Sequence, residues 1–191
     1  MQLRPYQEES RKRVQEEWNK GVKKTLLVLP TGCGKTIVFS KIIEDRVSIG
    51  ERVLILAHRG ELLEQASDKL EKATGLKTAT EKAEETAKDS WFRVTVGSVQ
   101  TLQREKRLNE FSKDYYDTIV IDEAHHCISE SYQRVLNHFD GANVLGVTAT
   151  PDRGDMKNLG TYFESLAYEY KLPQAIKAVS YTHLRAHETK A

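Results

Sequence analysis

The sequence lacks the long hydrophobic runs and the cysteine pairs that mark membrane-spanning and disulfide-rich proteins. Its longest apolar runs, at positions 26–29, 53–57 and 118–121, are far shorter than the roughly 20 residues that a membrane-spanning helix needs. Two cysteines among 191 residues are too few for a disulfide framework, which fits a reducing compartment. No charged and then apolar leader precedes Arg4. We therefore expect a cytoplasmic protein that acts without a membrane.

An excess of charge is also missing. The chain carries 29 basic and 28 acidic residues, and its formal net charge is +1. This balance excludes a globally basic nucleic-acid-binding arm but leaves room for a local basic groove. With 39% hydrophobic residues and 30% charged residues, the chain can bury the core of one ordinary globular domain.

The last thirteen residues do not continue the pattern of the chain before them. Residues 179–191, VSYTHLRAHETKA, have no apolar period and no turn chemistry. The string resembles the in-frame translation of a transposase-based sequencing adapter. We therefore expect a native domain over residues 1–177 and a non-native tail over residues 178–191.

Short apolar runs alternate with stretches of helical period in the native part. The apolar runs predict strands at 25–29, 52–57, 76–80, 92–96, 117–121 and 143–148. The helical periods predict helices at 6–18, 37–47, 62–73, 99–108 and 132–139. Residues 81–90 are highly charged and predict a solvated surface helix or loop. Because parallel strands need long crossovers, the alternation predicts a three-layer α/β/α domain with a mainly parallel sheet and ligands at the carboxyl ends of its strands.

The segment LPTGCGKT, which ends at Thr36, follows a predicted strand and opens a helix, the context of a phosphate-binding loop. Gly32 and Gly34 let the main chain turn tightly, so that successive N–H groups can wrap phosphates. Lys35 is expected to reach the β- and γ-phosphates, and Thr36 to bind Mg²⁺. A leucine stands where the strict pattern has its first glycine, and the alternative is a glycine turn with an incidental lysine.

Two further loop residues, Thr31 and Cys33, are included in the predicted nucleotide-binding set. Cys33 stands between the two glycines, and we interpret it as a small residue that fills the loop. It is not expected to be a nucleophile, because the sequence identifies no base to activate it.

A second motif, IVIDEAHH, is an apolar strand that delivers Asp122 and Glu123 at its carboxyl end. Since Mg²⁺ prefers carboxylate and phosphate oxygens, Asp122 is the expected metal-side acid. Glu123 is expected to orient and deprotonate the attacking water. We expect both acids to converge with the phosphate loop on one triphosphate–magnesium pocket. The neighbouring histidines and cysteine are not expected to bind zinc, because adjacent side chains diverge.

Six motifs occur in a fixed order along the chain. They are LRPYQ (3–7), LPTGCGKT (29–36), LAHRGELLEQ (56–65), TVGSVQTL (95–102), DEAHH (122–126) and VTATPDR (147–153). The order resembles that of superfamily 2 helicases, and the chain resembles the first RecA-like domain of a DEAD/DEAH-box helicase. It is most similar to the branch with type III restriction motor subunits and RadD-like repair helicases. The resemblance covers 1–177 and implies a RecA-like P-loop NTPase fold that uses ATP and Mg²⁺.

The resemblance also implies roles for residues around the nucleotide. Arg4 and Gln7 match an adenine-reading motif, and a glutamine amide can satisfy both N6 and N7 of adenine. Tyr6 is open to two interpretations, base stacking and core packing. His125 joins Lys35 and the two acids in the implied catalytic set.

Further roles concern nucleic acid and coupling. Two loop motifs match segments that grip the nucleic-acid backbone, and their residues are His58, Arg59, Gly60, Gly97, Ser98, Gln100 and Thr101. Thr148 and Thr150 match the TAT motif, which couples hydrolysis to nucleic acid and to the partner domain. The predicted strand that ends at Thr148 is expected to bring its hydroxyl close to the DEAH turn.

The resemblance implies the ATP-binding motor domain of a helicase or translocase. The intact parent protein is expected to hydrolyse ATP and to act on DNA rather than RNA. The second RecA-like domain of the same parent and its arginine are not matched in this chain. Such an arginine is worth ~10³- to 10⁵-fold in rate, so we expect the chain alone to bind ATP weakly and hydrolyse it negligibly. The alternatives are a restriction-system motor on duplex DNA, a non-hydrolysing nucleic-acid-binding module and another P-loop ATPase.

Overall fold

The computed structural model describes residues 2–58, 60–171, 173 and 176. The predicted tail at 178–191 lies outside the described residues. Seven strands form one sheet, and they are β1 (Lys24–Val28), β2 (Val53–Ala57), β3 (Thr78–Glu81), β4 (Val94–Ser98), β5 (Thr118–Asp122), β6 (Asn143–Thr148) and β7 (Ser165–Glu169). Their spatial order is β3-β4-β2-β5-β6-β1-β7, and all neighbouring pairs are parallel.

Helices connect the strands. They are α1 (Pro5–Asn19), α2 (Lys35–Ser48), α3 (Gly60–Thr74), α4 (Val99–Leu102), α5 (Glu105–Leu108), α6 (Glu130–His138) and α7 (Arg153–Leu159), with a 3₁₀ helix η1 (Ala124–Ile128). Among the described residues, none of the helices combines the length and the apolar character that crossing a membrane takes.

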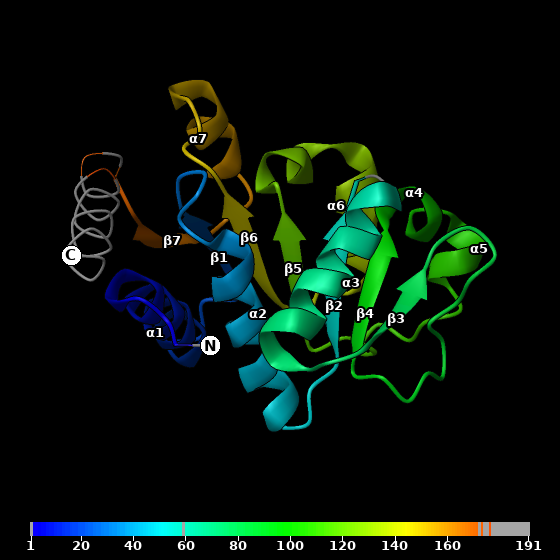
Figure 1. The fold of residues 1–191 in the computed structure, drawn as a ribbon. Coiled ribbons are helices and arrows are strands. Elements are labelled where there is room, and N and C mark those ends of the chain that lie inside the picture. Colours follow the sequence, from blue (N-terminus) through cyan, green and yellow to red (C-terminus); the bar gives the residue numbers. More distant parts are fainter. Residues whose placement is uncertain (1, 59, 172, 174–175, 177–191) are drawn as a thin grey trace.

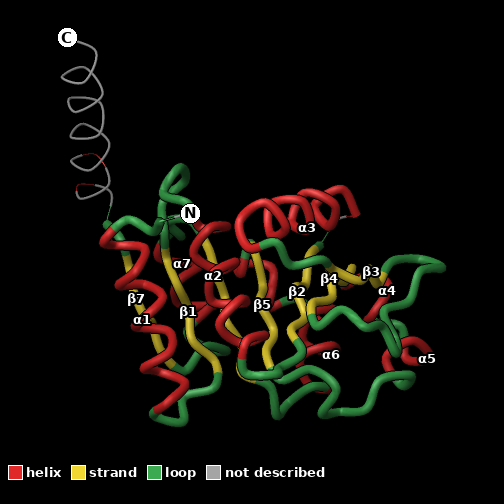
Figure 2. Tube along the Cα trace, turned by 60° about the horizontal axis from the view of Figure 1, so that its bottom comes forward, coloured by secondary structure: helices red, strands yellow, loops and turns green. Residues whose placement is uncertain are grey.

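The sheet is the middle layer of three, as the sequence predicted (Figures 1 and 2). Helices α1, α2 and α3 contribute to the buried cluster on one face, and α4, α5 and α6 to the cluster on the other. Along β1, Leu27 belongs to the first cluster, and Leu26 and Val28 belong to the second, because successive side chains of a strand point to opposite faces. Burial on both faces explains why these strands occur as continuous apolar runs in the sequence.

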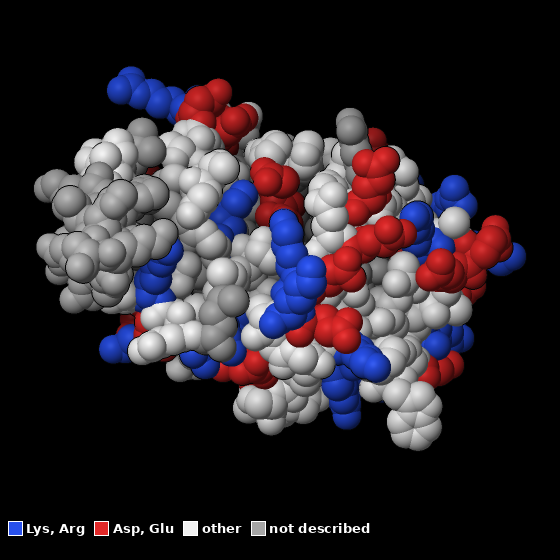
Figure 3. Space-filling view, in the orientation of Figure 1, with Lys and Arg blue, Asp and Glu red and all other residues white. Residues whose placement is uncertain are grey.

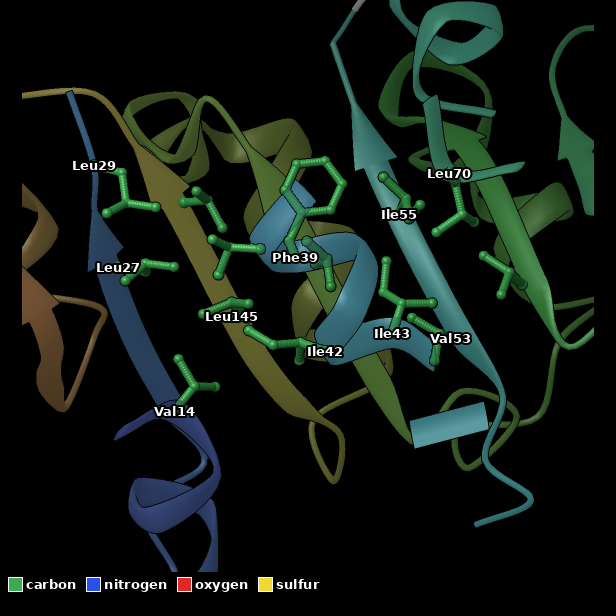
Figure 4. Close-up of a cluster of buried hydrophobic side chains, with 14 of the residues drawn as sticks. Val14, Leu27, Leu29, Phe39, Ile42, Ile43, Val53, Ile55, Leu70 and Leu145 are labelled. Carbon is green, nitrogen blue, oxygen red and sulfur yellow. The ribbon is translucent and has the colours of Figure 1, made fainter. Parts of the chain in front are cut away.

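The core under α2 fixes that helix over the centre of the sheet. Phe39 and Ile42 of α2 lie in one cluster with Leu145 of β6 and Ile55 of β2 (Figure 4). All four side chains are at most 3% exposed. The phosphate-loop helix is therefore anchored along its apolar face, and its first residue, Lys35, stands at the carboxyl edge of the sheet.

Three elements were not predicted from the sequence, and they are strand β7, helix α7 and the 3₁₀ helix η1. The single helix expected at 99–108 is two short helices, with Arg104 in an extended conformation between them. Strand β7 is an edge strand with Leu166 exposed and Ala167 buried, a weaker apolar pattern than that of the central strands.

The charged segment 81–90 is not wholly solvated, because its first residue is buried. Glu81 ends β3 at 0% exposure and forms an ion pair with Arg107 of α5. Its Oε2 accepts hydrogen bonds from Ala87 N at 2.6 Å and Thr86 Oγ1 at 3.1 Å. The carboxylate thus holds the loop between β3 and β4 to the edge of the sheet, a role that a charge pattern alone does not reveal.

Gly146 in the middle of β6 is a close-approach position. A Cβ there would lie 2.3 Å from Phe163 Cζ and 3.0 Å from the Cβ of Ala124. Ala124 opens η1 and directly follows the acidic pair. The packing at Gly146 therefore also fixes the start of the segment that carries the candidate catalytic acid.

We predict that Gly146→Ala lowers the free energy of unfolding by ~1–3 kcal/mol, because the added methyl overpacks a rigid aromatic ring and η1. Urea unfolding followed by circular dichroism measures the change. The matched control is Gly141→Ala, since a Cβ at Gly141 has nothing within 4 Å, and it should stay within ~0.5 kcal/mol of the parent chain. Equal unfolding midpoints for the two variants would show that the β6–η1 contact is not tight.

Candidate functional site

The loop between β1 and α2 has the backbone of a phosphate-binding turn. Gly32 and Gly34 have φ values of 84° and 75°, in the left-handed region. Gly34 is also the N-cap of α2, and a Cβ there would lie 2.4 Å from the Gln7 side-chain nitrogen. Two independent constraints thus require glycine at Gly34. The loop N–H groups and the start of a well-anchored helix meet at one place, which suits an anion.

The start of α1 holds this loop from the side. Gln7 is buried, and its Nε2 donates to Cys33 O at 3.1 Å while its Oε1 accepts from Arg4 N at 2.9 Å. Tyr6 donates its hydroxyl to the same Cys33 O at 3.0 Å. The Gln7 amide therefore braces the phosphate loop, and its reading of adenine with Arg4 stays a prediction.

Tyr6 has a packing partner that the sequence did not identify. Its ring stacks on that of Tyr170, just after β7, with 4.1 Å between the centroids and 5° between the planes. One face of Tyr6 is therefore occupied by protein. Tyr170 could not be found from the sequence because β7 itself was not predicted.

The acidic end of β5 reaches the phosphate loop, as predicted. Lys35 Nζ lies 3.2 Å from Glu123 Oε1. On the other side of this carboxylate, His125 Nδ1 lies 3.6 Å from Glu123 Oε2. Glu123 has a φ of 51°, a left-handed conformation that a residue with a side chain rarely adopts. The acid thus sits between a lysine and a histidine on a strained turn.

Asp122 is the more buried of the two acids at their shared end of β5. Burial raises the pKa of the Asp122 carboxyl above its ordinary value, while the Lys35 ammonium and the hydrogen bond from Glu123 N act against that rise. The bond from Glu123 N to Asp122 Oδ1 is 2.9 Å long. A desolvated carboxylate of this kind is stabilised by an added cation. With Thr36 lining the same cavity, the oxygen donors fit Mg²⁺.

Two cavities flank this meeting point. One has a volume of about 280 Å³ and is lined by both acids, and the other has a volume of about 510 Å³ and is lined by Thr31, Gly32 and Gly34. Four residues line both cavities, and they are Lys35, Thr36, Lys69 and Glu123. The loop, the lysine and the acid therefore border two adjoining cavities, where a triphosphate could be placed.

Helix α3 contributes two lysines that the sequence did not identify as site residues. Lys69 lines both cavities, and Lys72 lines the larger one. The Lys69 charge also acts to lower the pKa of Asp122. Helical spacing puts both lysines on the same side of α3 as Leu62 and Ala66. This spacing is visible in the sequence, but it identifies the lysines as site residues only once that side of the helix is known to cover the site. Figure 3 shows acidic and basic side chains interspersed on this side of the molecule, without a continuous basic patch.

In the first predicted nucleic-acid motif, His58 faces the cavity that contains the acids. The His58 ring lines the smaller cavity and stacks on the His126 ring, with 4.9 Å between centroids. Gly60 begins α3, where a Cβ would lie 2.8 Å from the Lys82 side chain. Arg59 lies outside the described residues.

In the second nucleic-acid motif most residues are turned inward. Gly97 is buried in β4, and a Cβ there would lie 2.7 Å from Leu102 Cδ1. Ser98 is 4% exposed, and Thr101 is 6% exposed and accepts a hydrogen bond from Ala83 N at 3.0 Å. Gln100 is exposed. Contacts of this motif with nucleic acid stay predictions, and Gln100 has the freest side chain for them.

The predicted coupling motif lies beside the acids. Strand β6 pairs with β5 so that Val147 is opposite Asp122, which confirms that the strand ends next to the DEAH turn. The carbonyl of Thr148 accepts a hydrogen bond from Leu29 N at 3.0 Å, and Thr148 itself is 3% exposed. Thr150 is exposed. Thr148 therefore contacts the phosphate-loop strand, and its neighbour Val147 pairs with the end of the strand that carries the acids.

Comparisons with known proteins agree with this geometry. The chain is 32% identical over 186 residues to a Schizosaccharomyces pombe protein named as the mitochondrial ATP-dependent helicase irc3, with 93% of the chain and 30% of that protein covered. It is 31% identical to the DNA 3'-5' translocase XPB2 of Sulfurisphaera tokodaii, with 83% of the chain and 33% of the translocase covered. The chain thus spans about a third of the length of these relatives.

A solved structure shares the fold. The nuclease-deletion mutant of the Type ISP restriction-modification enzyme LlaGI, in complex with a DNA substrate mimic, matches with a TM-score of 0.70 at 18% identity, covering 93% of this chain and 20% of that one. The family described as type III restriction enzyme, res subunit, matches residues 1–153. The chain therefore belongs to the res subunit family of type III restriction enzymes and has the first RecA-like domain of the superfamily 2 helicases.

Proposed function

We propose that the chain is the ATP-binding motor domain of an ATP-dependent helicase or translocase that acts on DNA rather than RNA. The observation that supports this most is the 3.2 Å contact of Lys35 with Glu123 at cavities lined by the phosphate loop. Two similar proteins point to DNA: one is named a DNA translocase, and the other was solved with a DNA substrate mimic.

The chemistry proposed for the site is hydrolysis of the γ-phosphate. The loop N–H groups and Lys35 bind the phosphates, and Glu123 orients a water and accepts its proton as the water oxygen attacks the γ-phosphorus. The bond to the bridging oxygen breaks, and ADP leaves with the electron pair. Mg²⁺, held by Thr36 and Asp122, would supply charge neutralisation on the phosphate oxygens.

A second RecA-like domain is part of this proposal. The chain covers 30% of the irc3 protein, and an arginine from a partner domain stabilises phosphoryl transfer by ~10³- to 10⁵-fold. We therefore assign residues 1–177 to one motor domain, residues 178–191 to an adapter-derived tail, and negligible hydrolysis to the chain alone. Fast DNA-stimulated turnover by the chain alone would contradict that last assignment.

A second candidate function is that of a restriction-system motor, which moves on duplex DNA without separating the strands. The match to the res subunit family favours it. The two candidates differ in a strand-displacement assay with the complete parent protein: a helicase releases a labelled strand during ATP hydrolysis, and a duplex translocase hydrolyses ATP without release. A cytoplasmic location is proposed for either, which the two free thiols fit.

We predict that Lys35→Ala weakens ATP binding by the chain ~10- to 100-fold, because a charge-assisted contact to phosphate is worth ~1.5–3 kcal/mol. Titration of the chain with a fluorescent ATP analogue and Mg²⁺ measures this. Lys12→Ala removes an exposed lysine on α1 and should leave the Kd unchanged. If both variants bind as tightly as the parent chain, the phosphate loop is not the nucleotide site.

Glu123→Gln is expected to separate binding from turnover. The amide keeps the shape of the side chain but cannot accept the proton, so ATP affinity should stay within ~3-fold while turnover falls ~10²- to 10⁴-fold. Phosphate release by the complete parent protein, with duplex DNA and with duplex RNA, gives the rate and the preferred track. Glu130→Gln, at an exposed position of α6, is the matched control. Normal turnover by the Glu123 variant would exclude this residue as the base.

A further inference from the structure

His58 and His126 connect two segments that are far apart in the sequence. His58 directly follows β2, and His126 lies on η1, three residues after Glu123. Their rings are parallel within 13°, with centroids 4.9 Å apart, and both line the cavity that contains the two acids. Tyr132 of α6 lies behind the pair, with its ring centroid 6.4 Å from each.

Glu123 depends on its surroundings for its conformation. A left-handed backbone is unfavourable for a residue with a side chain, so packing and hydrogen bonds must hold it. His126 N donates to Glu123 O at 3.1 Å, and His126 O in turn accepts from Ser129 N at 3.1 Å and Ser129 Oγ at 2.9 Å. The placement of His126 therefore determines how well the Glu123 turn is held, and the His126 ring rests on His58.

Hydrogen bonds do not explain the position of the His58 ring. Within the described part of the chain, His58 Nδ1 and the Tyr132 hydroxyl are buried side-chain atoms without a hydrogen-bond partner. Such atoms destabilise the fold and are rare in folded proteins, so each calls for an explanation such as a functional role. The ring is instead placed by stacking, a contact that tolerates sliding more readily than a directed bond.

We propose that the His58–His126 stack is a positioning contact that couples the segment after β2 to Glu123. The inference rests on the proposed function and on the sequence-based prediction that the motif at His58 contacts the nucleic-acid backbone. A shift of this segment on DNA moves the His58 ring, the His126 ring follows, and the Glu123 turn is tightened or loosened. Neither histidine touches the reacting atoms in this scheme. By linkage, nucleotide bound at Glu123 changes DNA affinity by the same factor.

The test measures that factor in the chain itself. The Kd of AMP-PNP with Mg²⁺ is determined without DNA and with saturating short duplex DNA, and the ratio of the two Kd values is the coupling. The unmodified chain is expected to give a ratio that differs from one by ~5-fold or more, the usual range of coupling between sites. His126→Ala should bring the ratio within ~2-fold of one while nucleotide affinity without DNA stays within ~3-fold.

Matched variants separate stacking from bulk. His126→Phe keeps a flat ring and should retain the coupling, whereas His126→Leu keeps volume without a stack and should lose it. Asn137→Ala, on the exposed face of α6, should behave as the unmodified chain. If the side chain at position 126 only fills space, leucine and phenylalanine should serve equally well. A difference in coupling between these two variants therefore tests the stack even where an alanine variant does not fold.

Three results would overturn the inference. A ratio of one in the unmodified chain means that there is no coupling to transmit. Full coupling in the alanine or leucine variants means that the stack does not transmit it. A chain that binds neither AMP-PNP nor DNA contradicts the proposed function as well, and is distinguishable from the first two results because binding itself is absent.

Discussion

The parallel pairing of β6 with both β1 and β5 is the constraint on which the site depends. It aligns the carboxyl ends of three strands, and these ends carry the phosphate loop, Thr148 and the acids. Lys35 and Glu123 are far apart in the sequence, yet they meet at 3.2 Å because only one strand separates their own strands. The hydrophobic burial that orders this sheet is therefore also what assembles the polar site at its edge.

The central part of this arrangement could be predicted from sequence for a physical reason. Strands buried on both faces need continuous apolar runs, and a phosphate loop needs glycines where φ is positive, so both leave local signals. Strand β7 and Lys69 have no local sequence signal of comparable strength. An edge strand buries one side, and Lys69 becomes a site residue only when α3 packs over the loop. The buried Glu81 was misjudged because its partner Arg107 lies in another element.

The Glu123 turn is held by two packing contacts. The His126 ring rests on His58, and Ala124 packs where Gly146 leaves no room for a side chain. The left-handed conformation of Glu123 is therefore held by residues next to β2, in β6 and in η1. A change in any of these three elements should alter how well the conformation is held. Strain stored at one residue and held from several elements is what makes such a residue sensitive to distant contacts.

The Lys35–Glu123 contact has a consequence for affinity. In the chain without nucleotide, the ammonium and the carboxylate satisfy one another, so bound phosphate must exchange one ionic contact for another. The net gain is smaller than for an unpaired lysine, because part of the attraction to phosphate replaces an attraction that already exists. Under the proposed function, the same exchange would free Glu123 to take a water proton only when phosphate occupies Lys35. The pair would then link release of the base to arrival of the substrate.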